Sequence, residues 1–279
     1  MDRRRSIRRP PASLTRFRDP TFHKRERFHF ETPRFNIRAV NRLEHEHTAD
    51  AIARRIASSK HNYIRDFIYG GIDGAVTTFA VVSGVAGAEL STTIILILGF
   101  ANLVADGFSM AASNFLGTRA EQDDYRRIEK IEYRHIELAP EGEREEVRQI
   151  YIGKGFEGDE LDRAVELITS DKDRWVKTML AEEYGLPSEV RSPWIASLAT
   201  FVAFVVCGLV PLVPYLLGVN SSFLVSCITT GATFFLIGSF KSRWSTTSWV
   251  RSGLETFFVG ALAAGLAYAV GVALKGIAG

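Results

Sequence analysis

Five apolar stretches, each at least 20 residues long, constrain the fold of this chain more than any other feature. A helix needs about 20 apolar residues to cross roughly 30 Å of hydrocarbon. Five such helices would be unusual in one soluble domain, so we predict an all-α polytopic membrane protein with five transmembrane helices. The stretches cover residues 67–88, 92–117, 194–217, 221–240 and 254–274, and none contains a lysine or an arginine.

The overall composition conceals this pattern, because 46% hydrophobic residues and a net charge of +2 are averages over unlike segments. Residues 1–66 carry 17 Lys and Arg against 8 Asp and Glu, whereas residues 119–191 carry 13 against 20. The second segment is therefore an acidic insert between spans two and three. We predict a disordered basic arm over 1–41, an amphipathic helix over 42–60, spans one and two within 61–118, a helical domain over 119–191 and spans three to five within 192–279.

The basic residues predict the orientation in the membrane. The segment before span one is rich in arginine and the loop between spans four and five holds three bases, whereas the other short connections hold none. With five spans, the N-terminus, the acidic insert and that loop lie in the cytoplasm. The C-terminal tail then lies outside, where Lys275 is an exception to the rule. Since no cleavable signal or organelle-targeting signal is visible, we expect a bacterial inner membrane.

The N-terminal segment leaves several interpretations open. The basic arm is either a solvated tail or a contact for anionic lipids. It contains no DNA- or RNA-binding module, so we expect no nucleic-acid partner. Thr48 is a candidate N-cap for the amphipathic helix, and the run EHEH at 44–47 is either a metal site or a solvated helix start. The two cysteines, Cys207 and Cys227, have no metal-ligand spacing.

Asp73 is an acid inside the first apolar stretch, where a charged side chain costs roughly 2.5–3.5 kcal/mol. It shares a helix face with Gly70, Gly74 and Thr77, small residues that let helices approach closely. A buried carboxylate without a base must be protonated, hydrated or bound to a cation. All three suit a cation path, although a hydrogen bond to a neighbouring hydroxyl would also explain a lone acid.

Span two carries a second polar stripe at helical spacing. A water-filled or ion-conducting interior accepts such a face, whereas lipid does not. Met110 taken alone could equally be an apolar residue that fills the core. The stripe consists of Asn102, Asp106, Met110 (or Ser109), Ser113 and Gly117.

The acidic insert reads as helical throughout. Its first helix continues span two as far as Pro140, a second covers 141–154 and a third covers 159–169. The fourth begins with Ser170 as cap and Asp173 at the capping-box position, and ends before Gly185. Glu-x-x-His on one helix facing Glu on another is the ligand pattern of di-iron bundles, although salt-bridged surface helices look similar. Three pairs have this kind of spacing: Glu132 with His135, Glu143 with Glu146, and Met179 with Glu183.

Two runs together resemble the vacuolar iron transporter family over roughly residues 60–275. They are DFIYGGIDGAVTTFAVVSGVAGA and GFANLVADGFSMAASNFLGTRAEQD, followed by the acidic insert. The resemblance is to the prokaryotic members. It implies five spans, a homodimer and a cytosolic helical metal-binding domain inserted between helices two and three. It also implies that Fe(II), often with Mn(II), leaves the cytosol in exchange for protons.

The resemblance also assigns roles to individual residues. Asp73 matches the intramembrane carboxylate of the transport path, and Met110 matches its thioether. Asn102 stands where some relatives have an acid, which Asp106, one turn further along, could replace. His135 stands where some relatives have Glu. The matching ligand positions in the insert are Glu132, Glu143, Glu146, Met179 and Glu183.

We therefore expect a proton-coupled transporter that exports divalent iron, and manganese, and not an enzyme. The insert collects the metal, which passes to Asp73 and Met110 between the first spans of two protomers. The expected partners are metal ions, protons, the bilayer and a second copy, with no prosthetic group. A membrane-tethered ferroxidase or iron buffer is the main alternative, and a passive cation channel is a third.

Overall fold

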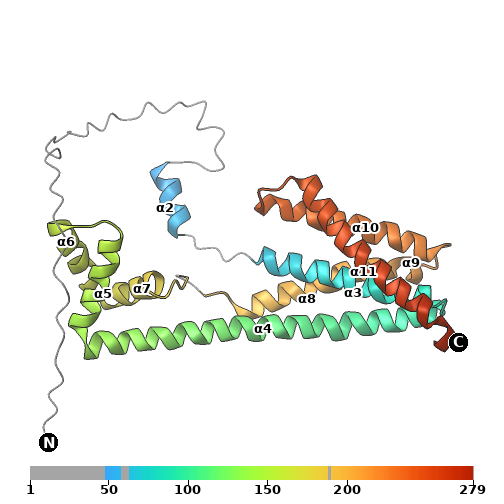
Figure 1. Ribbon diagram of the computed structural model, residues 1–279, viewed down its shortest axis with the longest axis horizontal. Coiled ribbons are helices and arrows are strands. Elements are labelled where there is room, and N and C mark those ends of the chain that lie inside the picture. Colours follow the sequence, from blue (N-terminus) through green and yellow to red (C-terminus); the bar gives the residue numbers. More distant parts are fainter. Residues whose placement is uncertain (1–47, 58–62, 188–189, 279) are drawn as a thin grey trace, which may run out of the picture. The chain divides into compact units, whose positions relative to one another are not determined.

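The computed structural model describes residues 48–57, 63–187 and 190–278, and all their regular structure is helical (Figure 1). The chain divides into two units, residues 1–58 and 59–279. In the first unit the described part is Thr48 and helix α2 (Ala49–Ala57). The Thr48 hydroxyl accepts a hydrogen bond from the Ala51 amide at 3.3 Å, as the predicted cap requires. The run at 44–47 lies outside the described residues.

Five helices of the second unit are long and apolar enough to cross a membrane. They coincide with the five apolar stretches, so this part of the prediction is confirmed. The second unit consists of α3 (Ile64–Gly87), α4 (Thr92–Leu138), α5 (Pro140–Gly153), α6 (Gly158–Thr169), α7 (Lys172–Glu182), α8 (Pro193–Leu209), η1 (Val210–Leu212), α9 (Val213–Leu216), α10 (Ser222–Lys241), η2 (Ser242–Trp244) and α11 (Trp249–Ala278).

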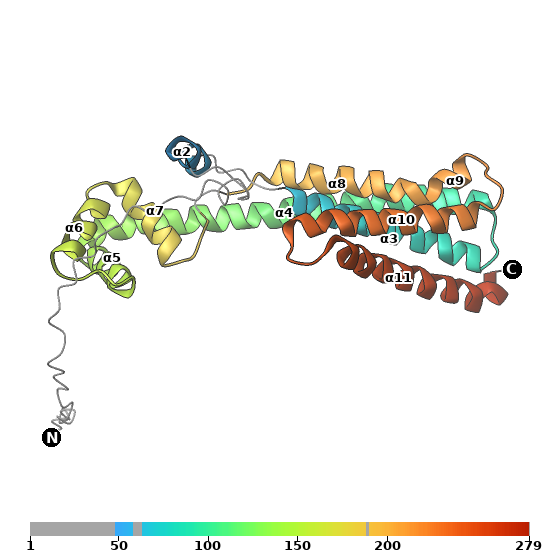
Figure 2. The same cartoon turned by 90° about the horizontal axis from the view of Figure 1, so that it is seen from above.

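Helix α3 lies at the centre of the apolar bundle and packs against α4, α8, α10 and α11 (Figure 2). Glycines allow the closest contacts. A Cβ atom at Gly70 or Gly74 would lie on the backbone of α8 at Thr200 or Phe204, so these helices pack backbone to backbone. The observed packing agrees with the small-residue face predicted for span one.

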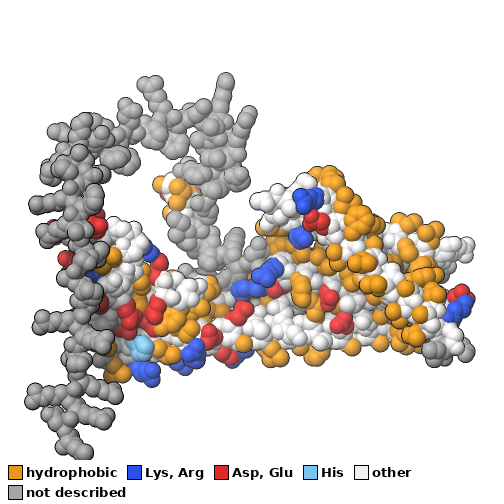
Figure 3. Space-filling view, in the orientation of Figure 1, with side chains coloured by type: hydrophobic (Ala, Val, Ile, Leu, Met, Phe, Trp, Pro, Cys, Tyr) orange, Lys and Arg blue, Asp and Glu red, His pale blue; other side chains and the backbone are white. Residues whose placement is uncertain are grey.

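Many apolar side chains lie on the face of the bundle that Figure 3 shows. Val104 and Phe108 of α4 and Leu262 and Leu266 of α11 each expose more than 60% of their surface. In water such a surface would be an aggregation hazard, whereas in hydrocarbon it is the expected one.

Helix α4 runs without a break for 47 residues, from the apolar bundle into the acidic insert (Figure 1). At 1.5 Å per residue it is about 70 Å long, more than twice the thickness of a hydrocarbon core. The last turns of α4 pack with α5, α6 and α7 around a separate apolar core. We call residues 119–191 the insert, and we call the end of the bundle from which it projects the insert end.

The start of α7 corrects one detail of the prediction. The N-cap is Asp171, whose Oδ1 accepts a hydrogen bond from the Arg174 amide at 2.7 Å. Ser170 is not the cap, because its hydroxyl donates to the Leu167 carbonyl of α6 at 2.9 Å and accepts from the Arg174 side chain, not from a backbone amide of α7. The carboxylate one residue later is therefore the group that reaches the free amides of the helix.

Candidate functional site

Polar side chains of α3 and α4 meet along one seam inside the apolar bundle. The Asn102 side-chain amide of α4 donates to the hydroxyls of Thr77 and Thr78 of α3, at 3.2 and 3.4 Å. One to two turns away, Asp73 of α3 and Asp106 of α4 lie close enough to interact electrostatically. Acids from two different spans therefore lie near each other at this seam. We call this contact the acidic seam.

The two carboxylates of the acidic seam are half-buried. Among the described residues, neither Asp73 nor Asp106 forms an ion pair or accepts a hydrogen bond. Thr77 and Thr78 accept hydrogen bonds from Asn102, and within the described part of the chain neither of them donates to Asp73. Two unpaired acids at this depth favour a bound cation, a proton or water as their partner.

Met110 is half-buried one turn from Asp106 and packs against the apolar core of the bundle. A soft thioether next to two carboxylates would give a cation site some preference for Fe(II) over Mg(II). Ser113 and Gly117, which extend the predicted stripe towards the insert, are exposed.

Sequence reasoning missed a third polar contact of α3 and α4, at the insert end of the seam. The Asn114 amide of α4 donates to Asp66 Oδ1 of α3 at 3.0 Å, and Arg191 forms an ion pair with Asp66 Oδ2. Asp66 is only 7% exposed. Two spacings in the sequence could have indicated this contact. Asp66 lies seven residues before Asp73, and Asn114 lies four residues after Met110. They went unused because Asp66 precedes the apolar run and Arg191 ends the insert.

A second group of acids lies in the insert, where α4, α5 and the end of α7 meet. Glu132 and Glu143 are buried, and each has one carboxylate oxygen without a hydrogen-bond partner among the described residues. The His135 ring nitrogen Nδ1 lies 3.3 Å from Glu143 Oε1 and 4.0 Å from Glu132 Oε1. The Tyr184 hydroxyl donates to Glu132 Oε1 at 3.0 Å. We call Glu132, His135, Glu143, Glu146 and Glu183 the insert cluster.

Crowding of acids changes the titration of the insert cluster. Burial, followed by the charges of Glu146 and Glu132, raises the pKa of Glu143 to about 7, and His135 acts in the opposite direction. Burial, then Glu132 and Glu146, also raises the pKa of Glu183. These carboxylates thus destabilise one another when all are ionised, which is the condition that a cation relieves.

The insert cluster is open to solvent on one side, because Glu146 and Glu183 are exposed. Met179 is fully buried in the apolar core of the insert, one turn before Glu183. Within the described part of the chain, no group of three or more His, Cys, Asp or Glu side chains converges closely enough to hold a metal ion. The sequence-derived set is therefore brought together on adjoining helices without forming a closed coordination shell. Repulsion between ionised carboxylates is sufficient to keep them apart.

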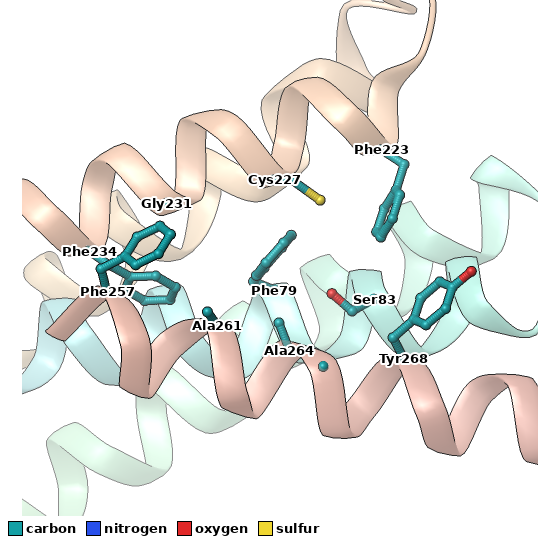
Figure 4. Close-up of a pocket in the computed structure, with 11 residues that line it drawn as sticks. Phe79, Ser83, Phe223, Cys227, Gly231, Phe234, Phe257, Ala261, Ala264 and Tyr268 are labelled. Carbon is teal, nitrogen blue, oxygen red and sulfur yellow. The ribbon is translucent and has the colours of Figure 1, made fainter. Parts of the chain in front are cut away.

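An apolar cavity of about 350 Å³ lies elsewhere, between α3, α10 and α11 (Figure 4). Phe79 and Phe234 form part of its wall, and its few polar groups include the hydroxyls of Ser83 and Tyr268. Because it contains no carboxylate, it is unsuited to a divalent cation. The acidic seam is the better candidate for an ion path.

Five apolar helices and a seam of unpaired acids define an integral membrane protein with a polar interior. Comparison with protein families specifies it further. The family model described as "VIT family" matches residues 64–272, from the start of α3 into α11. The chain belongs to the VIT family, and the resemblance noted in the sequence is confirmed.

Individual relatives match over most of their length. The vacuolar iron transporter of Toxoplasma gondii is 29% identical over 264 residues, which cover 88% of this chain and 87% of that protein. The vacuolar iron transporter of Plasmodium falciparum is 31% identical, covering 77% of this chain and 85% of its own. Vacuolar iron transporter 1 of Arabidopsis thaliana is 32% identical, covering 74% of this chain and 83% of its own.

Proposed function

We propose that this protein is a proton-coupled transporter that moves Fe(II), and also Mn(II), out of the cytosol. The observation that carries the proposal is the acidic seam, where Asp73 and Asp106 lie close enough to interact and have no basic partner among the described residues. A membrane anchor needs no such acids, and they are costly to retain in hydrocarbon. The relatives named above are iron transporters, which supports the choice of cargo.

Proton coupling follows from competition for one carboxylate. A metal ion held by Asp73 and Met110 is released when a proton from the outer side neutralises Asp73. Metal and proton then exclude each other, which is enough to link the two fluxes in opposite directions. A second copy of the chain, placed with its α3 next to this one, would complete the ligand set around the ion. Asn102 holds Thr77 and Thr78 beside the site.

The insert is proposed to collect the metal before transport. Its net charge of −7 raises the local cation concentration, and carboxylate, imidazole and thioether groups suit Fe(II), Mn(II) and Zn(II). Binding would draw the acids of the insert cluster around one or more ions. Met179, which is buried one turn before Glu183, would join them if its side chain turned out of the apolar core. His135 supplies a ligand without adding a negative charge. The Arg-rich segment before α3 favours a cytosolic position for the insert, in a cell membrane or a vacuole-type membrane alike.

The test is metal uptake by the purified full-length protein in liposomes that contain a pH-sensitive dye. Mn(II), or Fe(II) under reducing conditions, is added outside. We expect metal to enter while protons leave, and Asp73→Asn to abolish both without loss of folded protein. Glu255→Gln is a matched control, because Glu255 makes an exposed ion pair with Arg251 at 3.0 Å, away from the seam. Equal uptake by Asp73→Asn and the unaltered protein would contradict the proposal.

Other outcomes identify the rival functions. Metal uptake without proton movement would indicate a passive channel. A membrane-tethered ferroxidase is the second candidate function, because His135 lies beside Glu143 and Glu132 and such ligands also suit iron oxidation. Oxygen consumption on adding Fe(II) to the full-length protein, together with absent uptake, would favour that alternative. We expect no oxygen consumption above the rate in buffer.

A further inference from the structure

An ion pair between a buried carboxylate and a partly exposed arginine lies at the insert end of the acidic seam. Asp66 lies in the first turn of α3, and both of its carboxylate oxygens have partners. Asn114 donates to Oδ1 at 3.0 Å, and the Arg191 guanidinium pairs with Oδ2. The Asn114 amide also reaches the Thr200 hydroxyl of α8 at 2.7 Å, so the contact joins three spans.

Asp66 and Asn114 lie in register with the seam. Seven residues, or about two helical turns and roughly 10 Å along the axis, separate Asp66 from Asp73. Asn114 follows Asp106 and Met110 at steps of four residues, which keeps all three on one face of α4. The seam therefore presents successive contacts from the insert end inwards: Asp66 with Asn114, Asp73 with Asp106, and Asn102 with the two threonines.

Arg191 differs from the other groups at the seam because it belongs to the connection between the insert and α8. It precedes Pro193, the first residue of α8, by two residues, and its side chain is still 31% exposed. The guanidinium carbon lies 5.5 Å from the centre of the Tyr63 ring. Its Nε atom is buried without a hydrogen-bond partner among the described residues. An unsatisfied buried donor weakens this closed arrangement relative to one in which the side chain reaches water.

We propose that Asp66 is a further metal-binding carboxylate, at the cytosolic mouth of the path, and that Arg191 is a tethered cation that occupies it until a divalent metal replaces it. This inference rests on the transport function proposed above. The carboxylate exchanges a singly charged guanidinium for a doubly charged ion, so the incoming metal has the stronger electrostatic attraction. Arg191 moves towards the solvent that it already partly faces.

A purely structural role is the competing explanation. A buried ion pair with a partner on each side fastens helices together, and removal of one charge leaves the other buried and unpaired. Single substitutions alone would therefore confuse lost folding with lost binding. A variant in which both charges are removed and the shapes are kept separates the two explanations.

The experiment measures the KM for Mn(II) uptake by the full-length protein in liposomes, with metal added on the insert side. We expect Arg191→Gln to lower the KM by at least about fivefold, the low end of typical coupling between two ligands of one protein, because Asp66 loses its competitor. We expect Asp66→Asn to raise the KM by at least about fivefold for the same reason. Arg191→Lys keeps the positive charge that competes for Asp66 and should leave the KM within about twofold of the unaltered protein.

The double variant Asp66→Asn/Arg191→Gln decides between the explanations, with folding checked by monodisperse elution and an unchanged melting temperature. A ligand role leaves the double variant folded with the raised KM of Asp66→Asn. A structural role returns its KM to that of the unaltered protein, which would overturn the inference. This comparison remains decisive if Arg191→Gln alone fails to fold.

The two proposals fail in different ways. If the unaltered protein carries no Mn(II), or if Asp73→Asn carries it at the original rate, the transport function itself is wrong. If the unaltered protein carries Mn(II) with proton counterflow while Arg191→Gln and the double variant keep its KM, only the role of Asp66 and Arg191 is wrong.

Discussion

Glu143 is the residue at which the proposed metal binding would respond most directly to pH. With a pKa raised to about 7 by burial and by neighbouring acids, it passes from mostly ionised at pH 8 to mostly protonated at pH 6. Since a cation requires the ionised form, we expect Mn(II) affinity of the insert to fall about tenfold between these pH values, the change in ionised fraction for one such group. Binding is measured on the full-length Asp73→Asn protein, so that the seam contributes little.

The control for this prediction is an exposed acid on the same helix, Glu141. Glu141→Gln should keep the steep pH dependence of Mn(II) binding, whereas Glu143→Gln should bind more weakly at pH 8 and show a flatter pH profile. An unchanged profile in Glu143→Gln would mean that another group controls the proton competition.

The raised pKa of Glu143 also predicts how the stability of the metal-free insert depends on pH. A carboxyl whose folded-state pKa is raised binds more protons folded than unfolded, so its contribution to stability is lost as pH rises from about 4.5 through about 7. Glu143→Gln should therefore raise the metal-free melting temperature at pH 8 and leave it unchanged at pH 4. Each pK unit corresponds to ~1.4 kcal/mol, part of which solvent screens, so we expect a gain of about 1–2 kcal/mol. Differential scanning fluorimetry in chelator checks this, and a loss of stability at pH 8 would contradict it.

At the residue scale, the candidate site residues within the spans could be predicted because acids stand out against an apolar background. Asp73 and Asp106 were recognisable in this way, and the structure brings them to one seam. Asp66 and Arg191 were not, because each lies among charged residues at the edge of a span. Their pairing depends on how α8 packs against α3 and α4, which no local spacing encodes.

At the scale of helices, apolar length and chain-breaking residues were sufficient to locate the spans and the insert helices. The break of span three into α8, η1 and α9 follows Pro211 and Pro214, whose missing amide protons interrupt helical hydrogen bonding. The continuity of α4 followed from the absence of proline between the span and Pro140. The position of a cap within one residue, Asp171 instead of Ser170, depended on which side chain was already engaged by the preceding helix.

Contact between α3 and α8 gives a prediction at this scale. A Cβ atom at Gly74 would overlap the backbone of Phe204, so neither helix can yield without separating from the other. Gly74→Ala should therefore destabilise the protein by roughly 1–3 kcal/mol, the usual cost of overpacking. The measurement is the melting temperature of the purified protein in detergent.

Gly117 of α4 provides the matched control, because an added Cβ there meets nothing within 4 Å. Gly117→Ala should stabilise the helix by up to about 1 kcal/mol through helix propensity alone. Equal melting temperatures for the two alanine variants would show that the α3–α8 contact is looser than described.

At the scale of the whole molecule, the odd number of spans and the distribution of charge determine which parts share a side of the membrane. The bases of the α10–α11 connection, Lys241, Arg243 and Arg251, lie at the insert end of the bundle. Lys275, the exception at the opposite end, forms an ion pair with Glu89 at 2.6 Å. Its positive charge is thus balanced locally, which weakens its pull on orientation.

The distribution of positive charge predicts which of two single cysteines, introduced at opposite ends of the bundle, is accessible from outside the cell. In a background of Cys207→Ala and Cys227→Ala, Glu160→Cys lies on the exposed surface of the insert and Val219→Cys lies in the α9–α10 connection. A membrane-impermeant maleimide should label Val219→Cys in intact cells and leave Glu160→Cys unlabelled. Glu160→Cys should react only after permeabilisation, because the positive residues predict a cytosolic position for the insert end.

Detergent-solubilised protein is the control, since both cysteines should react there at similar rates if both are exposed. Labelling of Glu160→Cys in intact cells, with Val219→Cys protected, would reverse the orientation and with it the direction of transport. Labelling of both in intact cells would mean that the two ends share a side, which five membrane-crossing helices do not allow. The outcome therefore tests separately whether span three crosses the membrane and which way the bundle is oriented.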